Sequence, residues 1–294
     1  MILRVAVATA FLTFLALFWR VLDIEANPLD GWVYSAYAAA FTILAVYRAG
    51  LAARERQALR AAPRAARGER PWVQSLDLLG FAALPMGLML ATLYAVPEKT
   101  MGMLQRIFYV HVPSAWVAFI AFGVVAVASV VHLARRSAAA DRVAHASAEV
   151  GVVFTTIAVV TGPLWAKPAW GIWWTWDARL TLTLVLWLIY LGYLLLRLYI
   201  PDPERQARLA AVTGILGAVG VPIDYMAIRW WRTQHPQPVI GGGEGSGLHP
   251  TMLRAVLFMF GVFLVQYLAL VLRRAETARL ESQRDQGSGG PTSA

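Results

Sequence analysis

Long apolar stretches recur along this chain and constrain its fold more than any other feature. With few or no charges inside them, they run approximately over residues 2–22, 31–49, 74–96, 107–133, 148–166, 180–200, 209–229 and 252–272. Each could cross a hydrocarbon layer about 30 Å thick as a helix. Only 15% of the 294 residues are charged, against about 25% in a soluble domain. The sequence predicts an all-α, polytopic membrane helix bundle of about eight transmembrane helices.

Arginines gather in every second connection between these stretches, and cytoplasmic loops carry such an excess. This pattern predicts that both termini are cytoplasmic and that residues 23–30, 97–106, 167–179 and 230–251 form the outer loops. We expect three regions: an N-terminal helix pair with a basic cytoplasmic linker (1–71), a six-span domain (72–275) and a disordered cytoplasmic tail (276–294). The clustered arginines are Arg48, Arg54, Arg56, Arg60, Arg64, Arg67, Arg70, Arg135, Arg136, Arg142, Arg197, Arg205, Arg208, Arg273, Arg274, Arg279 and Arg284.

Several functions are excluded by what the chain lacks. It has no cysteine, so it offers no disulfide, thiolate metal site, cysteine nucleophile or covalent c-type haem attachment. It also has no G-x-x-x-x-G-K-[ST] phosphate loop, which excludes an ATPase of that type. The net charge of +9 comes from residues that flank apolar stretches, so we expect the partner to be membrane lipid and no nucleic acid.

Tryptophans concentrate in one predicted outer loop, in the stretch WAKPAWGIWWTWDARLT. Two more, Trp230 and Trp231, open the next outer loop. An aromatic belt would be shared by both membrane faces, whereas this cluster favours a flat apolar platform for a planar aromatic ligand. A plain interface belt stays open as the alternative. The candidate platform residues are Trp165, Trp170, Trp173, Trp174, Trp176 and Asp177, with Asp177 expected to accept N–H bonds or to pair with a cation.

Two predicted outer histidines flank the tryptophan loop in sequence. His111 lies in FYVHVPSAW, and His235 lies in RWWRTQHPQ. Two imidazoles are suitable axial ligands for a haem iron. His249 is a weaker candidate, because it follows the flexible stretch GGGEGSGL and could simply begin the last span.

These motifs resemble the CcmC family of haem-handling membrane proteins of cytochrome c maturation. WGIWWTWDARLT resembles the family's WWD signature, and the segments around His111 and His235 resemble those that carry its haem ligands. The resemblance covers roughly residues 74–275. It implies that His111 and His235 are the metal ligands and that the domain 72–275 holds haem b non-covalently at the outer face of the cytoplasmic (inner) membrane.

The resemblance further implies a carrier that is not an enzyme. Such a protein presents haem to the chaperone CcmE and works with the ABC-transporter subunits CcmA and CcmB. The haem propionates need cations, for which we expect Lys167, Arg179 and Arg232, with Arg229 and Arg254 as further outer-side candidates. A cytochrome c haem lyase of the CcsA or CcmF type remains the alternative function.

Overall fold

The computed structural model describes residues 28–62, 71–236 and 247–288, and these residues form helices joined by short connections. The expected span 2–22 lies outside them. Seven helical segments within the described residues are long and apolar enough to cross a membrane, which confirms an all-α polytopic membrane bundle. The elements are α2 (Pro28–Ala61), α3 (Pro71–Ala82), α4 (Leu84–Met89), the π-helical η3 (Leu90–Tyr94), the 3₁₀-helical η4 (Met103–Ile107), α5 (Phe108–Arg135), α6 (Ala138–Trp170), α7 (Ala178–Tyr199), α8 (Pro203–Trp230) and α9 (Pro250–Ser288).

Two helices extend into segments that the sequence assigned to a linker and to a disordered tail. The stretch 31–49 and the first part of the basic linker form the single helix α2, and α9 continues to Ser288. Residues 276–288 are therefore helical where the sequence predicted part of a disordered tail. The two extensions support each other, because Leu280 of α9 forms a buried cluster with Ala58 and Ala62 at the end of α2.

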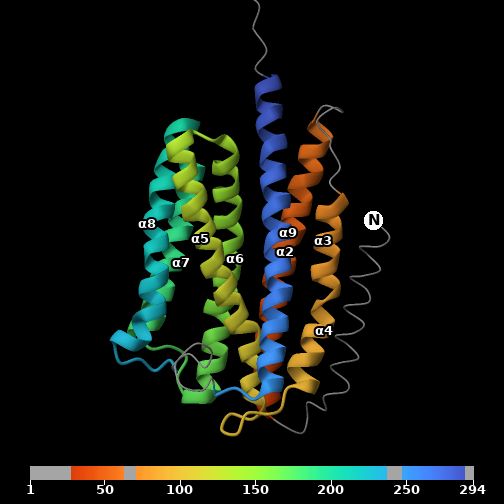
Figure 1. The fold of residues 1–294 in the computed structure, drawn as a ribbon, viewed down its shortest axis with the longest axis vertical. Coiled ribbons are helices and arrows are strands. Elements are labelled where there is room, and N and C mark those ends of the chain that lie inside the picture. The colour runs from red at the N-terminus through yellow and green to blue at the C-terminus, as the bar shows by residue number, and fades with distance from the viewer. Residues whose placement is uncertain (1–27, 63–70, 237–246, 289–294) are drawn as a thin grey trace, which may run out of the picture.

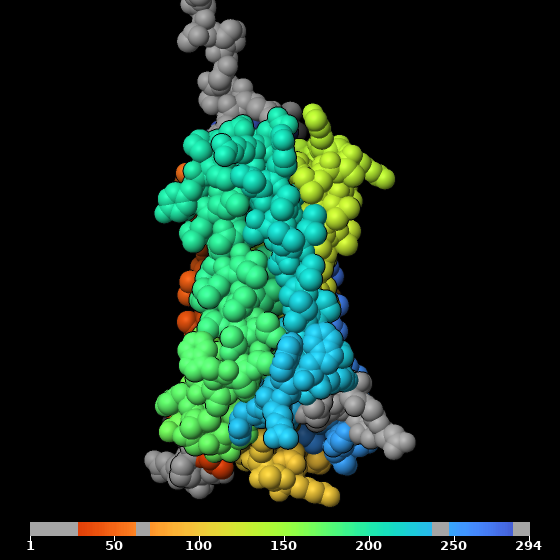
Figure 2. Space-filling model, turned by 90° about the vertical axis from the view of Figure 1, so that its left-hand side faces the viewer, coloured from red at the N-terminus to blue at the C-terminus, as the bar shows by residue number. Residues whose placement is uncertain are grey.

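The helices are arranged as a bundle in which α5, α6, α7 and α8 lie on one side and α9, α2 and α3 on the other (Figure 1). Figure 2 shows α7 and α8 side by side along one face. In the core, the ring of Phe122 stacks on that of Tyr190 with centroids 3.6 Å apart. A Cβ on Gly214 would lie 2.7 Å from Val125 Cγ1, so this glycine lets α8 approach α5 closely.

The connections of the bundle separate into two ends (Figure 1). One end, which we call the arginine-rich end, holds the short connections 136–137 and 200–202 and the end of α2. The other, which we call the tryptophan end, holds the connections 95–102, 171–177 and the described part of 231–249. All the predicted outer loops that the structure describes therefore lie together at one end.

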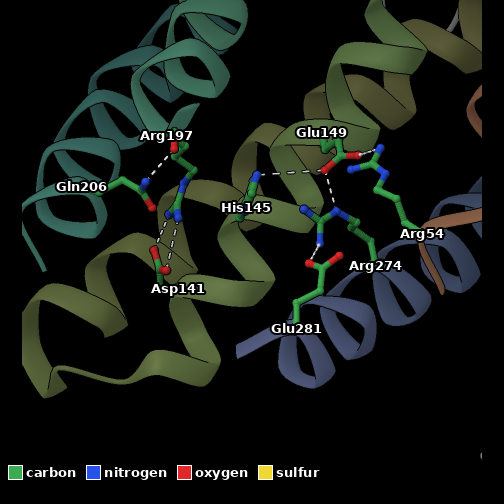
Figure 3. A network of polar contacts seen from close by, with 8 residues as sticks. All are labelled: Arg54, Asp141, His145, Glu149, Arg197, Gln206, Arg274 and Glu281. Atoms are coloured by element: carbon green, nitrogen blue, oxygen red, sulfur yellow. Dashed lines mark hydrogen bonds and ion pairs between the residues drawn. The ribbon is translucent and has the colours of Figure 1, made fainter. Parts of the chain in front are cut away.

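Ion pairs fasten α2 to the rest of the bundle towards the arginine-rich end. Glu149 of α6 accepts from Arg54 of α2 at 2.7 Å and from Arg274 of α9 at 2.6 Å (Figure 3). Asp77 of α3 likewise forms an ion pair with Arg48 of α2, with Oδ1 and Nη1 2.8 Å apart. Breaking a largely buried pair such as Arg48–Asp77 typically costs about 3–5 kcal/mol. The helix that precedes the predicted six-span domain is thus an integral part of the bundle.

Candidate functional site

His111 lies on the first turns of α5 and faces α6. Its Nδ1 is 3.0 Å from the hydroxyl oxygen of Thr161, and that hydroxyl donates its one proton to the carbonyl of Ile157 at 2.7 Å. With that proton on Ile157, Thr161 can accept from the Nδ1–H of His111, and in this tautomer Nε2 is unprotonated and carries a lone pair. A Cβ on Gly162 would lie 3.4 Å from His111 Cε1, so the glycine leaves room for the imidazole.

His235 lies in the segment that follows α8. Its Nδ1 is 3.0 Å from the carbonyl oxygen of Pro236, an acceptor that also fixes the proton on Nδ1. The two imidazoles are close enough to interact electrostatically, and both lie at the tryptophan end of the bundle. Burial lowers the pKa of His235, and the Arg179 guanidinium lowers it further, against the opposing effects of the Pro236 carbonyl and Asp177. The neutral ring, the form that binds a metal, is favoured.

The tryptophan loop begins where α6 ends. Gly171 has φ +78°, the left-handed conformation that ends helices, and its N–H donates to the Lys167 carbonyl at 2.9 Å. Glycine adopts this conformation without the strain that a Cβ adds. Lys167 Nζ donates back to the Gly171 carbonyl at 2.9 Å. The chain therefore turns sharply out of α6, and the loop runs across the tryptophan end to α7.

Asp177 connects this loop to the segment that carries His235. Its Oδ1 accepts from Leu180 N at 3.0 Å and caps the N-terminus of α7. Its Oδ2 accepts from Gln234 N at 2.9 Å and from the hydroxyl of Thr175 at 3.1 Å. Asp177 thus accepts backbone N–H bonds, one of the roles predicted for it. Through Gln234 it tethers the residue next to His235.

The indoles occupy several environments around the histidines. Trp165 lies on α6 with its ring centroid 5.9 Å from that of His111. Trp174 and Trp176 form an edge-to-face pair at 5.9 Å. Among the described residues, the Nε1 atoms of Trp165 and Trp174 are buried and have no acceptor. Trp170, the last residue of α6, is half-buried.

Other indoles are open to solvent. Trp173 and Trp176 are 50% and 76% exposed, and Trp230 and Trp231 are 56% and 51% exposed. Trp230 and Trp231 form a second edge-to-face pair at 5.8 Å. Exposed aromatic surface of this kind is typical both of ligand or partner sites and of side chains at a membrane interface.

Among the predicted cations, Arg179 is the one that the structure places beside the histidines, since its charge acts on both His111 and His235. It also donates through Nη1 to the backbone carbonyl of Asp224, and its Nε lies 3.8 Å from Asp224 Oδ1. The fully buried carboxylate of Asp224 is 3.1 Å from the hydroxyl of Thr183. Part of the bonding capacity of Arg179 is therefore used within the protein.

The other four candidate cations differ in their surroundings. Arg232 is exposed in the segment after α8, and Lys167 bonds across the turn that ends α6. Arg229 lies over the ring of Tyr225. Arg254 donates to the hydroxyl of Tyr94 at 2.8 Å.

His249 has only local contacts among those described. Its Nδ1 is 2.8 Å from the Thr251 hydroxyl and 3.3 Å from Thr251 N, so it belongs to the start of α9, as its sequence position suggested. Sequence reasoning missed Thr161 and Trp32. Thr161 precedes Trp165 by one helical turn and shares its face, which was a usable signal. Trp32 of α2 meets Trp173 with centroids 5.4 Å apart, and no local pattern links these two residues.

Most of this chain matches one known protein family. The family profile described as CcmC, heme exporter protein C, matches residues 56–288. The chain belongs to this family. Among its relatives, heme exporter protein C of Bradyrhizobium diazoefficiens is 37% identical over 202 residues, which cover 69% of this chain and 75% of the relative. Heme exporter protein C of Haemophilus influenzae is 35% identical over 209 residues, 70% of this chain and 85% of the relative.

A third relative is a ccmC-like mitochondrial protein of cytochrome c biosynthesis from Marchantia polymorpha, 34% identical over 188 residues, 63% of this chain and 79% of the relative. Membership places this chain among multi-pass membrane proteins of the heme exporter family, which take part in haem delivery for cytochrome c maturation. The matched residues include His111, the tryptophan loop and His235, but not residues 28–55 of α2.

Proposed function

We propose that the tryptophan end binds haem b non-covalently, with Nε2 of His111 and Nε2 of His235 as the two axial ligands. The observation that carries this proposal is that two electrostatically interacting imidazoles at one end of the bundle each have an oxygen within hydrogen-bond distance of Nδ1. A ligating histidine typically donates its second ring N–H to an oxygen, which orients the ring and makes the ligating nitrogen more basic. Thr161 and the Pro236 carbonyl are in that position.

The indoles suit the rest of such a ligand. A porphyrin is planar, apolar over most of its area and acidic at its two propionates. The exposed rings of Trp173 and Trp176 offer aromatic surface that keeps water from a bound planar molecule. The propionates call for donors, which Arg179 and the unpartnered indole N–H groups of Trp165 and Trp174 provide.

The two ligands differ in how firmly they are held, which suits a carrier that must release its cargo. His111 lies on a long helix packed in the bundle core, whereas His235 lies in a non-helical segment tethered through Asp177. In our proposal His235 lets go first when haem passes to a CcmE-like chaperone. ATP hydrolysis takes place in CcmA, which acts with CcmB as the transporter partner of this chain.

The same proposal places the protein in the cytoplasmic (inner) membrane with the tryptophan end outward. The arginine excess at the opposite end supports this orientation. Reporters fused after Ala66 and after Gln286 should report a cytoplasmic location, and one inserted in the GGGEGSG stretch an external location. A cytoplasmic signal from the GGGEGSG insertion would place the site on the wrong side for an outer-face chaperone.

Haem capture and transfer by the purified full chain test the function itself. We expect the chain in lipid nanodiscs to bind haem with a Soret band and to retain a CcmE-like chaperone only when haem is present. Trp173→Ala combined with Trp174→Ala should weaken both, because two aromatic surfaces are lost from the loop. The matched control is Trp72→Ala, which removes a 55% exposed indole from the start of α3 at the other end.

The outcomes separate the two alternatives. If the purified chain attached haem to an apocytochrome by bonds that survive acid–acetone extraction, it would be a lyase of the CcsA or CcmF type. If the double variant kept haem and the chaperone like the wild type, the indoles would be an interface belt.

A further inference from the structure

Residues 28–55 of α2 lie outside the family match, yet this part of the helix reaches the tryptophan loop. The ring of Trp32 meets that of Trp173 edge-to-face, with centroids 5.4 Å apart and planes at 61°. Trp32 itself is half-buried and packs against the hydrophobic core of the bundle. The ring of Trp32, which packs against the core, thus contacts the half-exposed ring of Trp173 in the loop.

The same end of α2 also contacts the segment that precedes His111 in the chain. The hydroxyl of Tyr37 donates to the backbone carbonyl of Arg106 at 2.8 Å, and Tyr37 is almost fully buried. Arg106 lies in η4, the short helix that leads directly into α5. Asp30, one turn before Tyr34 and also buried, interacts electrostatically with Arg106. This end of α2 therefore contacts both the loop and the segment before one proposed ligand.

We propose that Trp32 is a positioning residue for the haem site: it fixes the indole of Trp173, and with it the tryptophan loop, in the orientation that receives haem. This proposal rests on the proposed haem-binding function. An edge-to-face aromatic pair adds about 0.5–1.5 kcal/mol beyond the area it buries, which corresponds to about a two- to tenfold change in an equilibrium or rate. The pair is strong enough to bias the position of the loop.

The first experiment needs no haem. Hydrogen exchange of the full apo chain in nanodiscs is followed in peptides covering residues 171–177, and in peptides covering the connection 200–202 at the opposite end as an internal control. Trp32→Leu keeps an apolar side chain but removes the ring, so we expect about two- to tenfold faster exchange in 171–177 and no change in 200–202. Trp32→Phe, which keeps a ring, should restore slow exchange. Unchanged exchange of 171–177 in Trp32→Leu overturns the proposal, whatever the fate of the haem-binding function.

The second experiment measures the rate at which haem passes from the loaded chain to excess apomyoglobin. Trp32→Leu should release haem about two- to tenfold faster than the wild type, and Trp32→Phe should not. If Trp32 acts through Trp173, the double variant with Trp173→Ala should release haem no faster than Trp173→Ala alone. Trp72→Ala on α3 is the matched control and should behave as wild type.

The results distinguish the positioning role of Trp32 from the haem-binding function. If Trp173→Ala accelerates release but Trp32→Leu does not, haem binding stands and the positioning role of Trp32 is refuted. If the effects of the two substitutions multiply, Trp32 acts independently of Trp173 and the proposal is also refuted. A wild-type chain that takes up no haem refutes the proposed function, while the exchange experiment still decides whether Trp32 orders the loop.

Discussion

Replacing Asp177 by Asn should separate two roles that one carboxylate combines. Oδ1 caps α7, and Oδ2 accepts from Gln234 N at 2.9 Å. Asn caps helices as well as Asp does, so the side-chain carbonyl can keep the bond to Leu180 N. The amide NH₂ then faces the N–H of Gln234. Both groups are donors, so the hydrogen bond that Gln234 N–H makes to the carboxylate is lost. A hydrogen bond to a charged group contributes about 1.5–3 kcal/mol, so haem held through the adjacent His235 should leave about ten- to a hundredfold faster.

The assay is transfer of haem from the loaded chain to excess apomyoglobin, followed by Soret absorbance, with thermal unfolding measured in parallel. Asp202→Asn is a matched control, because Asp202 caps α8 by accepting from Arg205 N at 3.1 Å at the arginine-rich end. We expect Asp202→Asn to release haem at the wild-type rate and both variants to keep near-wild-type unfolding temperatures. Wild-type release from Asp177→Asn, or equal acceleration in both variants, would refute the tether.

Other substitutions and a pH titration test the surroundings of the two histidines. Thr161→Val removes the acceptor of His111 Nδ1–H and should lower haem affinity about ten- to a hundredfold, the usual effect of losing such a partner. The control Thr155→Val removes a hydroxyl that donates to its own helix and should leave haem affinity unchanged. Equal affinities of the two variants would refute the assignment. Asp224→Leu leaves a guanidinium without its buried partner and should lower the free energy of unfolding by about 3–5 kcal/mol, measured by denaturant titration; a change below 1 kcal/mol would contradict the pairing. Because burial and a nearby guanidinium lower the pKa of His235, haem retention in a pH titration should stay full down to the ordinary histidine pKa of about 6.5 and fall only at lower pH, so loss beginning above 6.5 would contradict the shift.

The helical architecture could be predicted because a membrane restricts the choices. Backbone groups in hydrocarbon must bond within the segment, and the long apolar stretches that the structure describes are helices. Because arginines gather in every second connection, the sequence assigned the loops to two ends of the bundle. The structure places the described loops at those two ends. The ends of α2 and α9 were harder, because Leu280 stabilises both through contacts between residues more than two hundred positions apart.

The candidate site was predictable where one local motif carried it. His111, His235 and the tryptophan loop could be named from sequence, and in the structure the two histidines are close enough to interact electrostatically. The buried support was not predictable. The pairing of Arg179 with Asp224 and the meeting of Trp32 with Trp173 depend on how each helix is rotated against its neighbours. Rotation is set by tertiary packing, which a single sequence does not display.

Electron paramagnetic resonance of the ferric haem complex tests the central claim most directly. Two imidazole ligands should give a low-spin signal in the wild-type chain. His111→Gly and His235→Gly should each convert it to a high-spin signal, and added imidazole should restore the low-spin form by filling the vacated position. If either glycine variant keeps the wild-type low-spin signal without added imidazole, that histidine is not an iron ligand and the bis-histidine site is refuted.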